Sequence, residues 1–207
     1  GQRTWRLYGF RIDWVPGFFT SQRLGLLFAG CAWGSVAEGL TLFIIRQAFR
    51  TRERWLIYSR EELVAHELCH VARLAFGSVE YEELCAYQTS TSRFRRVIGG
   101  LLRSPLDSYL LLGTTLGLAL AQGINVMTRP PSDWYHQPMP IVFGVGGLAL
   151  AWVIGGYLRN LWRWRRARRH LAAVLGPEAA LPVLFRCGDD ELVQLAALSR
   201  TQVAGWL

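Results

Sequence analysis

Two long stretches without a charged residue constrain the fold of this chain more than any other feature of its sequence. Residues 109–127 and 140–158 each contain 19 uncharged and mainly apolar residues. As helices that rise about 1.5 Å per residue, each would be about 28 Å long, close to the ~30 Å thickness of the hydrocarbon core of a bilayer. Buried helices of soluble proteins rarely run so far without a charge. The two stretches therefore predict a pair of transmembrane helices.

A third apolar stretch, residues 24–45, contains a single glutamate. As a membrane span it would place the arginines on its two flanks on opposite sides of the bilayer, against the usual distribution of positive charge. The pattern of apolar residues instead predicts a strand over residues 8–14, a helix over 21–37, and two strands over 41–49 and 54–58. We therefore expect an N-terminal domain outside the membrane and two spans, with a third span as the open alternative.

The basic residues predict the orientation of the two spans. All 23 are arginine, against 15 acidic residues, and only Arg129 lies between the spans. Positive charge favours the cytoplasmic side, which predicts an integral protein of a bacterial inner membrane with both termini in the cytosol. Six arginines alternate with Trp162 and Trp164 directly after the second span. This pattern is typical of an anchor at the lipid headgroups, so a lipid bilayer is an expected partner and nucleic acid is not.

Residues 66–70 read His-Glu-x-x-His, a pattern with a specific chemistry. A Ser-x-x-Glu capping box at residues 59–62 predicts the start of a helix that ends near Gly77. On this helix His66 and His70 lie one turn apart on the same face, so both imidazoles can reach one ion. The charged residues of the helix place it outside the hydrocarbon. The motif therefore predicts a zinc site on a helix outside the membrane.

The third ligand of such a site is expected on the helix that follows. A second helix is predicted over residues 78–96, and a pair of glutamates lies near its start. Two antiparallel helices that turn near Gly77 bring residues at equal distances from the turn side by side, which places both Glu82 and Glu83 near His70. From the spacing alone, either glutamate can be the ligand.

A His-Glu-x-x-His helix followed by a helix with Glu-x-x-Ala resembles the gluzincin-type zinc metallopeptidases, in particular the membrane-associated Ste24/HtpX type and the small soluble ImmA/IrrE type. The resemblance covers residues 40–97. In those families the ligand glutamate stands three residues before a small alanine, which implies Glu83 as the ligand and Ala86 as the small residue. Tyr87 stands where those families usually carry Asp or Asn. The implied fold is α+β, a small sheet packed on an active-site helix and a glutamate helix, followed by two transmembrane helices and a helical tail.

These predictions divide the chain into three successive parts. Residues 1–105 are expected to form a cytosolic zinc-peptidase-like domain, residues 106–158 a transmembrane hairpin, and residues 159–207 a basic interfacial segment and a small helical region. The end of the chain is similar to the core of a helix-turn-helix, but it lacks the usual turn glycine, which favours a plain helical hairpin. A membrane-tethered DNA-binding regulator is therefore the weakest of the functional hypotheses.

The predicted function is a membrane-anchored zinc-dependent endopeptidase at the cytosolic membrane face. Zinc lowers the pKa of a bound water, and Glu67 is expected to act as the general base that passes the proton to the leaving amine. Tyr81, Tyr87 and Arg73 are alternative contacts for the substrate or the transition state. The strand over 41–49 offers an edge for an extended polypeptide substrate. The alternative is a catalytically silent zinc-binding membrane regulator or partner-binding module, against which the presence of Glu67 argues.

Overall fold

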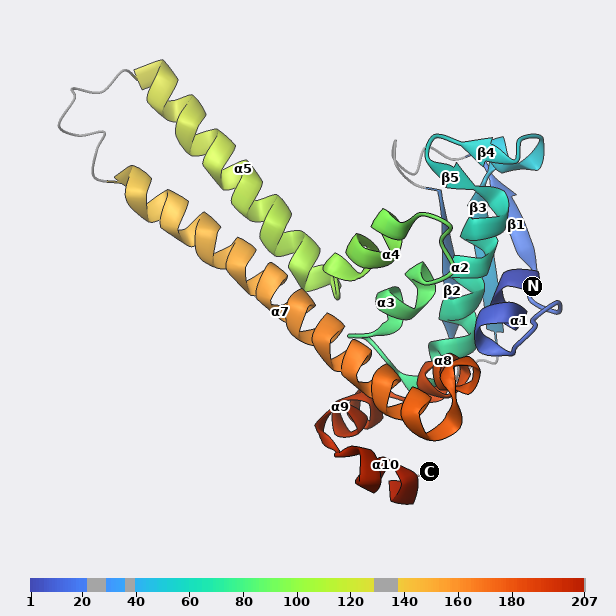
Figure 1. Ribbon diagram of the computed structural model, residues 1–207. Helices are drawn as coiled ribbons and strands as arrows, with labels where there is room; N and C mark the ends of the chain where they lie inside the picture. The colour runs from blue at the N-terminus through green and yellow to red at the C-terminus, as the bar shows by residue number, and fades with distance from the viewer. Residues whose placement is uncertain (22–28, 36–39, 129–137, 207) are drawn as a thin grey trace. The chain divides into compact units, whose positions relative to one another are not determined.

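The computed structural model shows a mixed α and β fold that is mainly helical (Figure 1). It describes residues 1–21, 29–35, 40–128 and 138–206. In chain order the elements are α1 (Gln2–Tyr8), β1 (Gly17–Thr20), β2 (Gly30–Ser35), β3 (Leu40–Arg46), the 3-10 helix η1 (Gln47–Arg50), β4 (Arg54–Trp55), β5 (Tyr58–Ser59), α2 (Arg60–Arg73), η2 (Leu74–Phe76), α3 (Glu82–Tyr87), α4 (Arg93–Ile98), η3 (Gly99–Leu101), α5 (Pro105–Thr128), α7 (Pro138–Leu175), α8 (Pro177–Arg186), α9 (Asp189–Ala197) and α10 (Arg200–Trp206).

The described residues form two compact units. Residues 1–100 and 161–207 make up the first unit, and residues 101–160 make up the second. The sequence suggested that the last part of the chain stands apart from the N-terminal domain. It packs against that domain instead, because Phe185 of α8 stacks on Tyr8 of α1 with 4.1 Å between the ring centres. The C-terminal helices are therefore part of the N-terminal domain.

The first unit contains a three-stranded sheet in the order β1, β3, β2 and a separate β4–β5 hairpin. The central strand β3 pairs parallel with β1 and antiparallel with β2. The strand predicted over residues 41–49 is thus β3 followed by a 3-10 turn, and both of its sides are paired. Among the described residues, β2 is the edge strand that lies next to α2. Because β2 and all but the last residue of β3 lie within residues 24–45, this segment is not one membrane-spanning helix, and the alternative of a third span is wrong.

Two predictions for the N-terminal region are also wrong. Residues 8–14 do not form a strand, since α1 ends at the start of this segment and the rest has no regular structure. Their alternating apolar side chains serve another purpose, because Phe10 stacks on Phe185 with 5.0 Å between the ring centres. The helix predicted over residues 21–37 is contradicted by β2, and most of the remaining part of that segment lies outside the described residues.

Helix α2 follows the prediction closely. Its N-terminal cap is Ser59, whose hydroxyl accepts a hydrogen bond from the backbone N–H of Glu62 at 3.2 Å. Gly77 ends the following 3-10 turn in the left-handed conformation, with a φ of 58°. The helix contacts β2 and β3 as well as α3 and α1, and it therefore buries apolar residues such as Leu63 and Leu68 on more than one side. This position makes α2 the central helix of the first unit.

The helix predicted over residues 78–96 is instead two short helices, α3 and α4. They are separated by a Thr-Ser-Thr-Ser run at residues 89–92. Side chains of this kind hydrogen-bond to the nearby backbone and compete with helix formation. Here the hydroxyl of Thr89 donates to the carbonyl of Ala86 at 2.7 Å, and the hydroxyl of Ser92 accepts from the first turn of α4. The glutamate pair therefore lies on a helix of only six residues.

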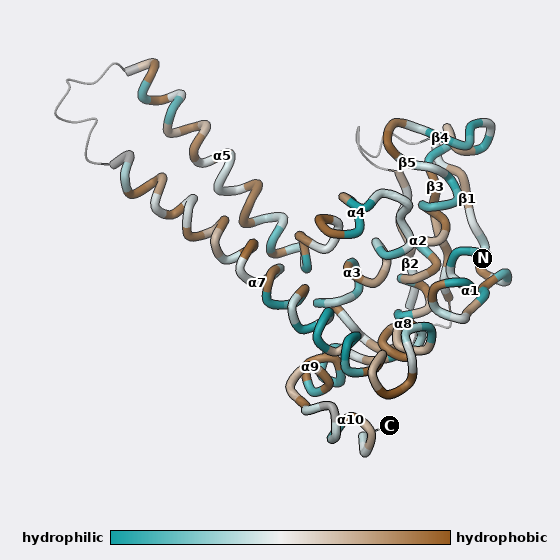
Figure 2. Tube along the Cα trace, viewed as in Figure 1, coloured by the Kyte–Doolittle hydropathy of each residue, from teal (hydrophilic) through white to brown (hydrophobic). Residues whose placement is uncertain are grey.

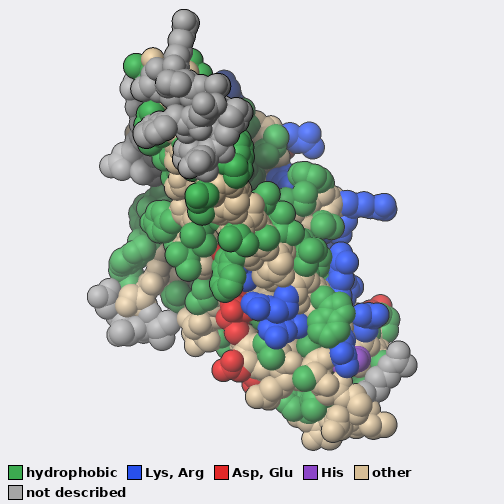
Figure 3. Space-filling view, turned by 90° about the vertical axis from the view of Figure 1, so that its left-hand side faces the viewer, with side chains coloured by type: hydrophobic (Ala, Val, Ile, Leu, Met, Phe, Trp, Pro, Cys, Tyr) green, Lys and Arg blue, Asp and Glu red, His purple; other side chains and the backbone are tan. Residues whose placement is uncertain are grey.

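The second unit contains α5 and the first part of α7, which correspond to the two long apolar helices that the sequence predicted. Residues 105–127 of α5 and 140–175 of α7 are long and apolar enough to cross a membrane. Figure 2 shows the hydrophobic residues along both helices and the change to hydrophilic residues in the later part of α7. Large side chains such as Leu116, Met127 and Leu148 are exposed, and Figure 3 shows mainly hydrophobic side chains on the hairpin surface that faces the viewer. An exposed apolar surface of this extent indicates contact with lipid or protein.

Candidate metal centre

Two histidines of α2 form one side of the centre. His66 and His70 lie one turn apart, and their Nε2 atoms are 3.1 Å from each other. The two rings meet edge to face, with 4.8 Å between their centres. Their side chains are only 16% and 18% exposed. The helix thus brings two imidazole nitrogens to one point on its side that faces α3.

Helix α3 adds a carboxylate at the same point. The two oxygens of Glu83 lie 3.5 Å from Nε2 of His66 and 3.4 Å from Nε2 of His70. The ligand atoms of these three residues all lie within 4.8 Å of one another, so the group could hold a metal ion. In a tetrahedral site with metal–ligand bonds of about 2.0–2.1 Å, neighbouring ligand atoms are about 3.3 Å apart. The observed spacing therefore fits a small divalent cation without a movement of either helix.

The two glutamates that the sequence left open have different positions. Glu82 does not join the group, because its carboxylate oxygen lies 2.9 Å from Nδ1 of His70, on the far side of that ring. His66 has a comparable partner, since it hydrogen-bonds to the backbone of Ala86. Carboxylate and carbonyl partners of this kind fix the tautomer and the orientation of metal-binding histidines. Glu83 thus belongs to the group that could hold an ion, and Glu82 contacts His70 from outside that group.

The electrostatics of the two histidines differ. Burial and the neighbouring His70 lower the pKa of His66 to about 3, although the bond to the backbone of Ala86 acts in the opposite direction. Burial also lowers the pKa of His70, but the bond to Glu82 and the charge of Glu83 outweigh this effect and raise the pKa. Neutral imidazole is the form that binds a metal. His66 is therefore ready to bind at neutral pH, whereas cation binding competes with a proton on His70.

Glu67 lies beside the group and is buried. Burial raises the pKa of its carboxyl to about 7, the positive charge of His70 opposes this shift, and the negative charge of Glu83 adds to it. The backbone of Ala32 in β2 hydrogen-bonds to the same carboxyl and also opposes the shift. A carboxyl whose pKa lies near the working pH can both accept and deliver a proton. Its environment therefore suits Glu67 for general acid and base chemistry.

The three residues predicted as alternative substrate or transition-state contacts occupy different places. Tyr87 lies in the site, with its ring edge-on to His66 at 4.6 Å between the ring centres, and it lines the cavities on both sides of that histidine. Tyr81 and Arg73 are fully buried and line neither cavity. The guanidinium of Arg73 donates to backbone carbonyls at the end of α8. Only Tyr87 can therefore contact a molecule bound beside the histidines.

A cleft of about 400 Å³ opens over the three metal-binding residues, and one of its walls is β2. Gly30 to Gly34 of this strand line the cleft together with both histidines and both glutamates. The sequence placed a strand edge for substrate binding at residues 41–49, but that segment is the central strand. The available edge belongs to β2, where the side opposite β3 has no partner strand among the described residues. An edge of this kind can add an extended peptide as a further strand.

Two further cavities lie beside the cleft. The first, of about 270 Å³, shares Glu67 and Tyr87 with the cleft. The second, of about 1020 Å³, shares Tyr58, Glu62 and Arg95 with the first. The three cavities are therefore neighbours along α2. No motif marked Tyr58 or Arg95 in the sequence, and only the packing of the β4–β5 hairpin and α4 around α2 brings them to these cavities.

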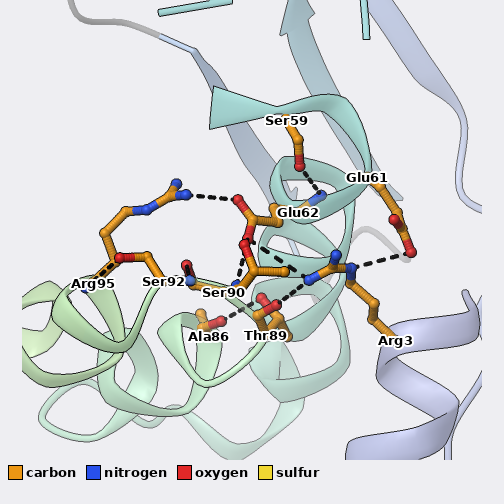
Figure 4. Close-up of polar contacts among 10 residues, drawn as sticks. Arg3, Ser59, Glu61, Glu62, Ala86, Thr89, Ser90, Ser92 and Arg95 are labelled. Atoms are coloured by element: carbon orange, nitrogen blue, oxygen red, sulfur yellow. Dashed lines mark hydrogen bonds and ion pairs between the residues drawn. The ribbon is translucent and has the colours of Figure 1, made fainter. Parts of the chain in front are cut away.

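A buried carboxylate, that of Glu62, lines both of these cavities, and Figure 4 shows its polar contacts. Glu62 accepts hydrogen bonds from the backbone N–H and the hydroxyl of Thr91, and from the guanidinium of Arg95 at 2.8 Å. Arg3 lies 3.7 Å from the same carboxylate and donates to the carbonyl of Thr89. Burial raises the pKa of Glu62, but the bonds from Thr91 and Arg95 outweigh it and lower the pKa. In the sequence this glutamate read as part of a capping box, whereas its side chain instead binds the segment after α3.

Comparisons of the chain with known protein families, with curated proteins and with solved structures found no match. Within the part of the chain that the structure describes, His66, His70 and Glu83 form the group of metal-binding side chains that is close enough to share an ion. The geometry of this group and of the cavities around it is therefore the basis for a proposed function.

Proposed function

We propose that this chain is a membrane-anchored zinc-dependent endopeptidase that cleaves polypeptides at the cytosolic face of the membrane. The observation that supports this most strongly is the convergence of His66, His70 and Glu83 beside the buried Glu67, in a cleft with an available strand edge. Two imidazole nitrogens and one carboxylate are a donor set that suits zinc. Three protein ligands also leave a fourth position for water, as in hydrolytic zinc sites.

The chemistry of peptide hydrolysis then divides among the residues of the cleft. His66, His70 and Glu83 would hold a zinc ion, which would supply a coordinated water with a pKa lowered to about 7 and an electrophile for the scissile carbonyl. Glu67 lies beside this group and would accept the proton of the attacking water and deliver it to the leaving amine. The hydroxyl of Tyr87 is the donor proposed for the carbonyl oxygen, because Tyr87 is the candidate that lines the cleft. These roles match those of a gluzincin-type centre.

The resemblance to gluzincins is supported by the roles of the residues on α3. Glu83 occupies the ligand position, and Ala86 lies three residues later, where it hydrogen-bonds to His66 through its backbone. Tyr87 stands where the related families usually carry Asp or Asn, and here its ring contacts His66. A carboxylate partner for a histidine is nevertheless present, since Glu82 binds Nδ1 of His70. Glu82, at the start of α3, is thus proposed to provide the carboxylate partner of a histidine that Tyr87 cannot provide.

The proposed substrate is an extended polypeptide. Its backbone pairs with β2, which brings a peptide bond past the metal centre and Glu67. On the far side the chain enters the cavity between Tyr58, Tyr87 and Arg95. The exposed side chains of Leu56 and Phe94 line the outer cavity. This mixture of apolar and charged lining residues favours unfolded or membrane-proximal polypeptides with mixed side chains over one narrow sequence.

The proposed location rests on α5 and α7, which are long and apolar enough to cross a membrane. In the arginine-rich stretch that follows the uncharged part of α7, Trp162 is exposed and lies under the guanidinium of Arg166. Aromatic rings and arginines at this position support an anchor at the headgroups of a lipid bilayer. By the positive-inside rule, the same arginines favour a cytosolic location for the metal centre and both termini. Nucleic-acid binding forms no part of this proposal.

The test compares the full-length protein with Glu67→Gln and with the control Glu178→Gln. Glu178 is an exposed residue in the first turn of α8 and lines none of the three cavities. Zinc content and hydrolysis of an unfolded protein such as casein are measured for all three. We expect one zinc per chain in each, and a loss of turnover of about 10²-fold or more only in Glu67→Gln. A zinc-loaded wild type that does not hydrolyse peptides contradicts the proposal and favours the silent zinc-binding module.

A further inference from the structure

Helix α3 carries the glutamate ligand but is too short to hold its own position. It has six residues, and no side chain caps its first turn. Isolated helices shorter than about 12 residues are marginal in water. The positions of Glu82 and Glu83 relative to the histidines therefore depend on the packing of the buried side of α3 against α2, on the bond from the Tyr8 hydroxyl to the carbonyl of Cys85, and on contacts at the two ends of α3.

The end after α3 is held by α2 itself. The buried Glu62 accepts two hydrogen bonds from Thr91, and its ion pair with Arg95 adds a third contact (Figure 4). These bonds connect the first turn of the histidine helix to the segment between α3 and α4. One end of the glutamate helix is thus fixed to the element that carries the other ligands.

The end before α3 is held by the C-terminal region. One oxygen of the Asp189 carboxylate accepts hydrogen bonds from the backbone N–H of Val79 at 2.8 Å and of Glu80 at 2.9 Å. Its other oxygen accepts a hydrogen bond from the hydroxyl of Ser78. A single carboxylate of α9 therefore binds three consecutive residues of the linker that joins the histidine helix to the glutamate helix.

The last turn of α2 takes part in the same set of hydrogen bonds. The guanidinium of Arg73 is fully buried and donates to the hydroxyl of Ser78 at 2.7 Å. It also donates to the carbonyls of Phe185 and Cys187, which lie directly before α9. A buried guanidinium needs such partners, because an unpaired buried charge is strongly destabilising. Arg73 and Asp189 together therefore fasten the C-terminal region to both sides of the linker.

We propose that Asp189 is a positioning residue of the metal centre. Its carboxylate fixes the linker so that α3 begins where Glu83 meets the two histidines and Glu82 meets His70. This inference deepens the proposed function and rests on the same metal-binding group. It also assigns a role to the C-terminal region, since a residue that follows both long apolar helices completes a site whose ligands all precede them.

The experiment uses the full-length protein in detergent with Asp189→Ala, and the matched control is Asp190→Ala, the exposed neighbour on the same helix. The dissociation constant for zinc is measured by competition with a chromophoric chelator, and the visible spectrum of the cobalt-loaded protein reports the ligand geometry. Loss of partners that orient ligands typically weakens metal binding about 10- to 100-fold. We expect about 10-fold weaker binding and an altered cobalt spectrum for Asp189→Ala, and binding within about 2-fold of wild type for Asp190→Ala.

Two further variants separate positioning from a general loss of structure. Asp189→Glu keeps the carboxylate and is expected to recover part of the affinity, and Asp189→Asn keeps one acceptor oxygen and is expected to lie between wild type and Asp189→Ala. Circular dichroism of the metal-free proteins identifies variants that do not fold, and Asp189→Asn replaces Asp189→Ala if the latter is unfolded. Equal zinc affinity of wild type and the folded variant overturns this inference alone. Tight zinc binding without peptide hydrolysis in the wild type overturns the proposed peptidase function alone, and a wild type that binds no zinc overturns both.

Discussion

Helices α2 and α3 contribute side chains to the same candidate metal centre, but they are specified in different ways. Helix α2 has 14 residues and its own serine cap, a glycine ends the 3-10 turn that follows it, and it packs against the sheet and two helices. Helix α3 has only six residues; it packs on α2 and is bound at its two ends by contacts of Glu62 and Asp189. The comparison indicates that the histidine half of the centre is encoded locally. The glutamate half depends on contacts with residues that are distant in the sequence.

The largest effect is expected from the two glutamates of α3. Glu83→Ala removes a ligand and is expected to weaken zinc binding by more than 10²-fold. Glu82→Gln removes only the carboxylate partner of His70 and is expected to weaken it about 10- to 100-fold. Chelator competition measures both effects. A larger loss of zinc affinity in the Glu82 variant than in the Glu83 variant would show that Glu82 is the ligand and Glu83 the partner of His70.

The next effect concerns Glu67 and the pH dependence of stability in the metal-free protein. The folded state raises the pKa of this carboxyl from 4.5 to about 7, so the folded protein keeps a proton that the unfolded chain has released. The stability contribution of Glu67 therefore falls as pH rises from about 4.5 to 7, by about 3 kcal/mol in total. Thermal unfolding between pH 5 and 8 should show this decrease in wild type. In Glu67→Gln the decrease should be smaller by that amount, and identical profiles would show that Glu67 does not titrate near 7.

Glu62 is expected to change the stability of the protein with pH in the opposite direction from Glu67. Its pKa is lowered in the folded state by the bonds from Thr91 and Arg95, so its stabilising contribution is present above about pH 4.5 and is lost as pH falls through the lowered pKa. Glu62→Gln should reduce the free energy of unfolding at pH 7 by about 1–3 kcal/mol. The difference from wild type should shrink in acid. A variant as stable as wild type at pH 7 would mean that α3 does not need this anchor.

The smallest effect is expected for the cap of α2. Ser59→Ala removes the hydroxyl that accepts the bond from the N–H of Glu62 and should cost about 1 kcal/mol of stability. Zinc affinity should remain within about 2-fold of wild type, because the remaining contacts of α2 hold the two histidines in place. Calorimetry measures the loss of stability, and the chelator competition measures the zinc affinity. A large loss of zinc affinity would show that the position of α2, like that of α3, depends on a single contact at its end.

The sequence predicted those parts of the structure that depend on local signals. The cap at Ser59, the terminating Gly77 and the two long apolar helices agree with the structure because each signal lies within one helix. The predictions failed at residues 8–14 and 21–37, where tertiary packing decides the conformation. The alternation in the first segment reflects aromatic stacking with α8, and a strand order with β3 in the centre cannot be deduced from the apolar pattern of single strands.

The candidate site shows the same division. The two histidines and Glu67 could be read from one motif. The choice between Glu82 and Glu83 could not be made from the spacing, and only the resemblance indicated Glu83. Nothing in the sequence pointed to the role of Asp189, because its partners lie about 110 residues earlier in the chain. Such contacts leave no periodic pattern and become visible only once the helices are placed.

X-ray absorption spectroscopy at the zinc edge of the full-length protein identifies the atoms bound to the metal. If His66, His70 and Glu83 are the ligands, the spectrum will show two imidazole nitrogens and light carboxylate or water oxygens at about 2.0–2.1 Å, with loss of one oxygen-type ligand in Glu83→Ala. Sulfur neighbours at about 2.3 Å would instead indicate cysteine ligands and contradict the assignment. A purified protein that retains no zinc would contradict it as well.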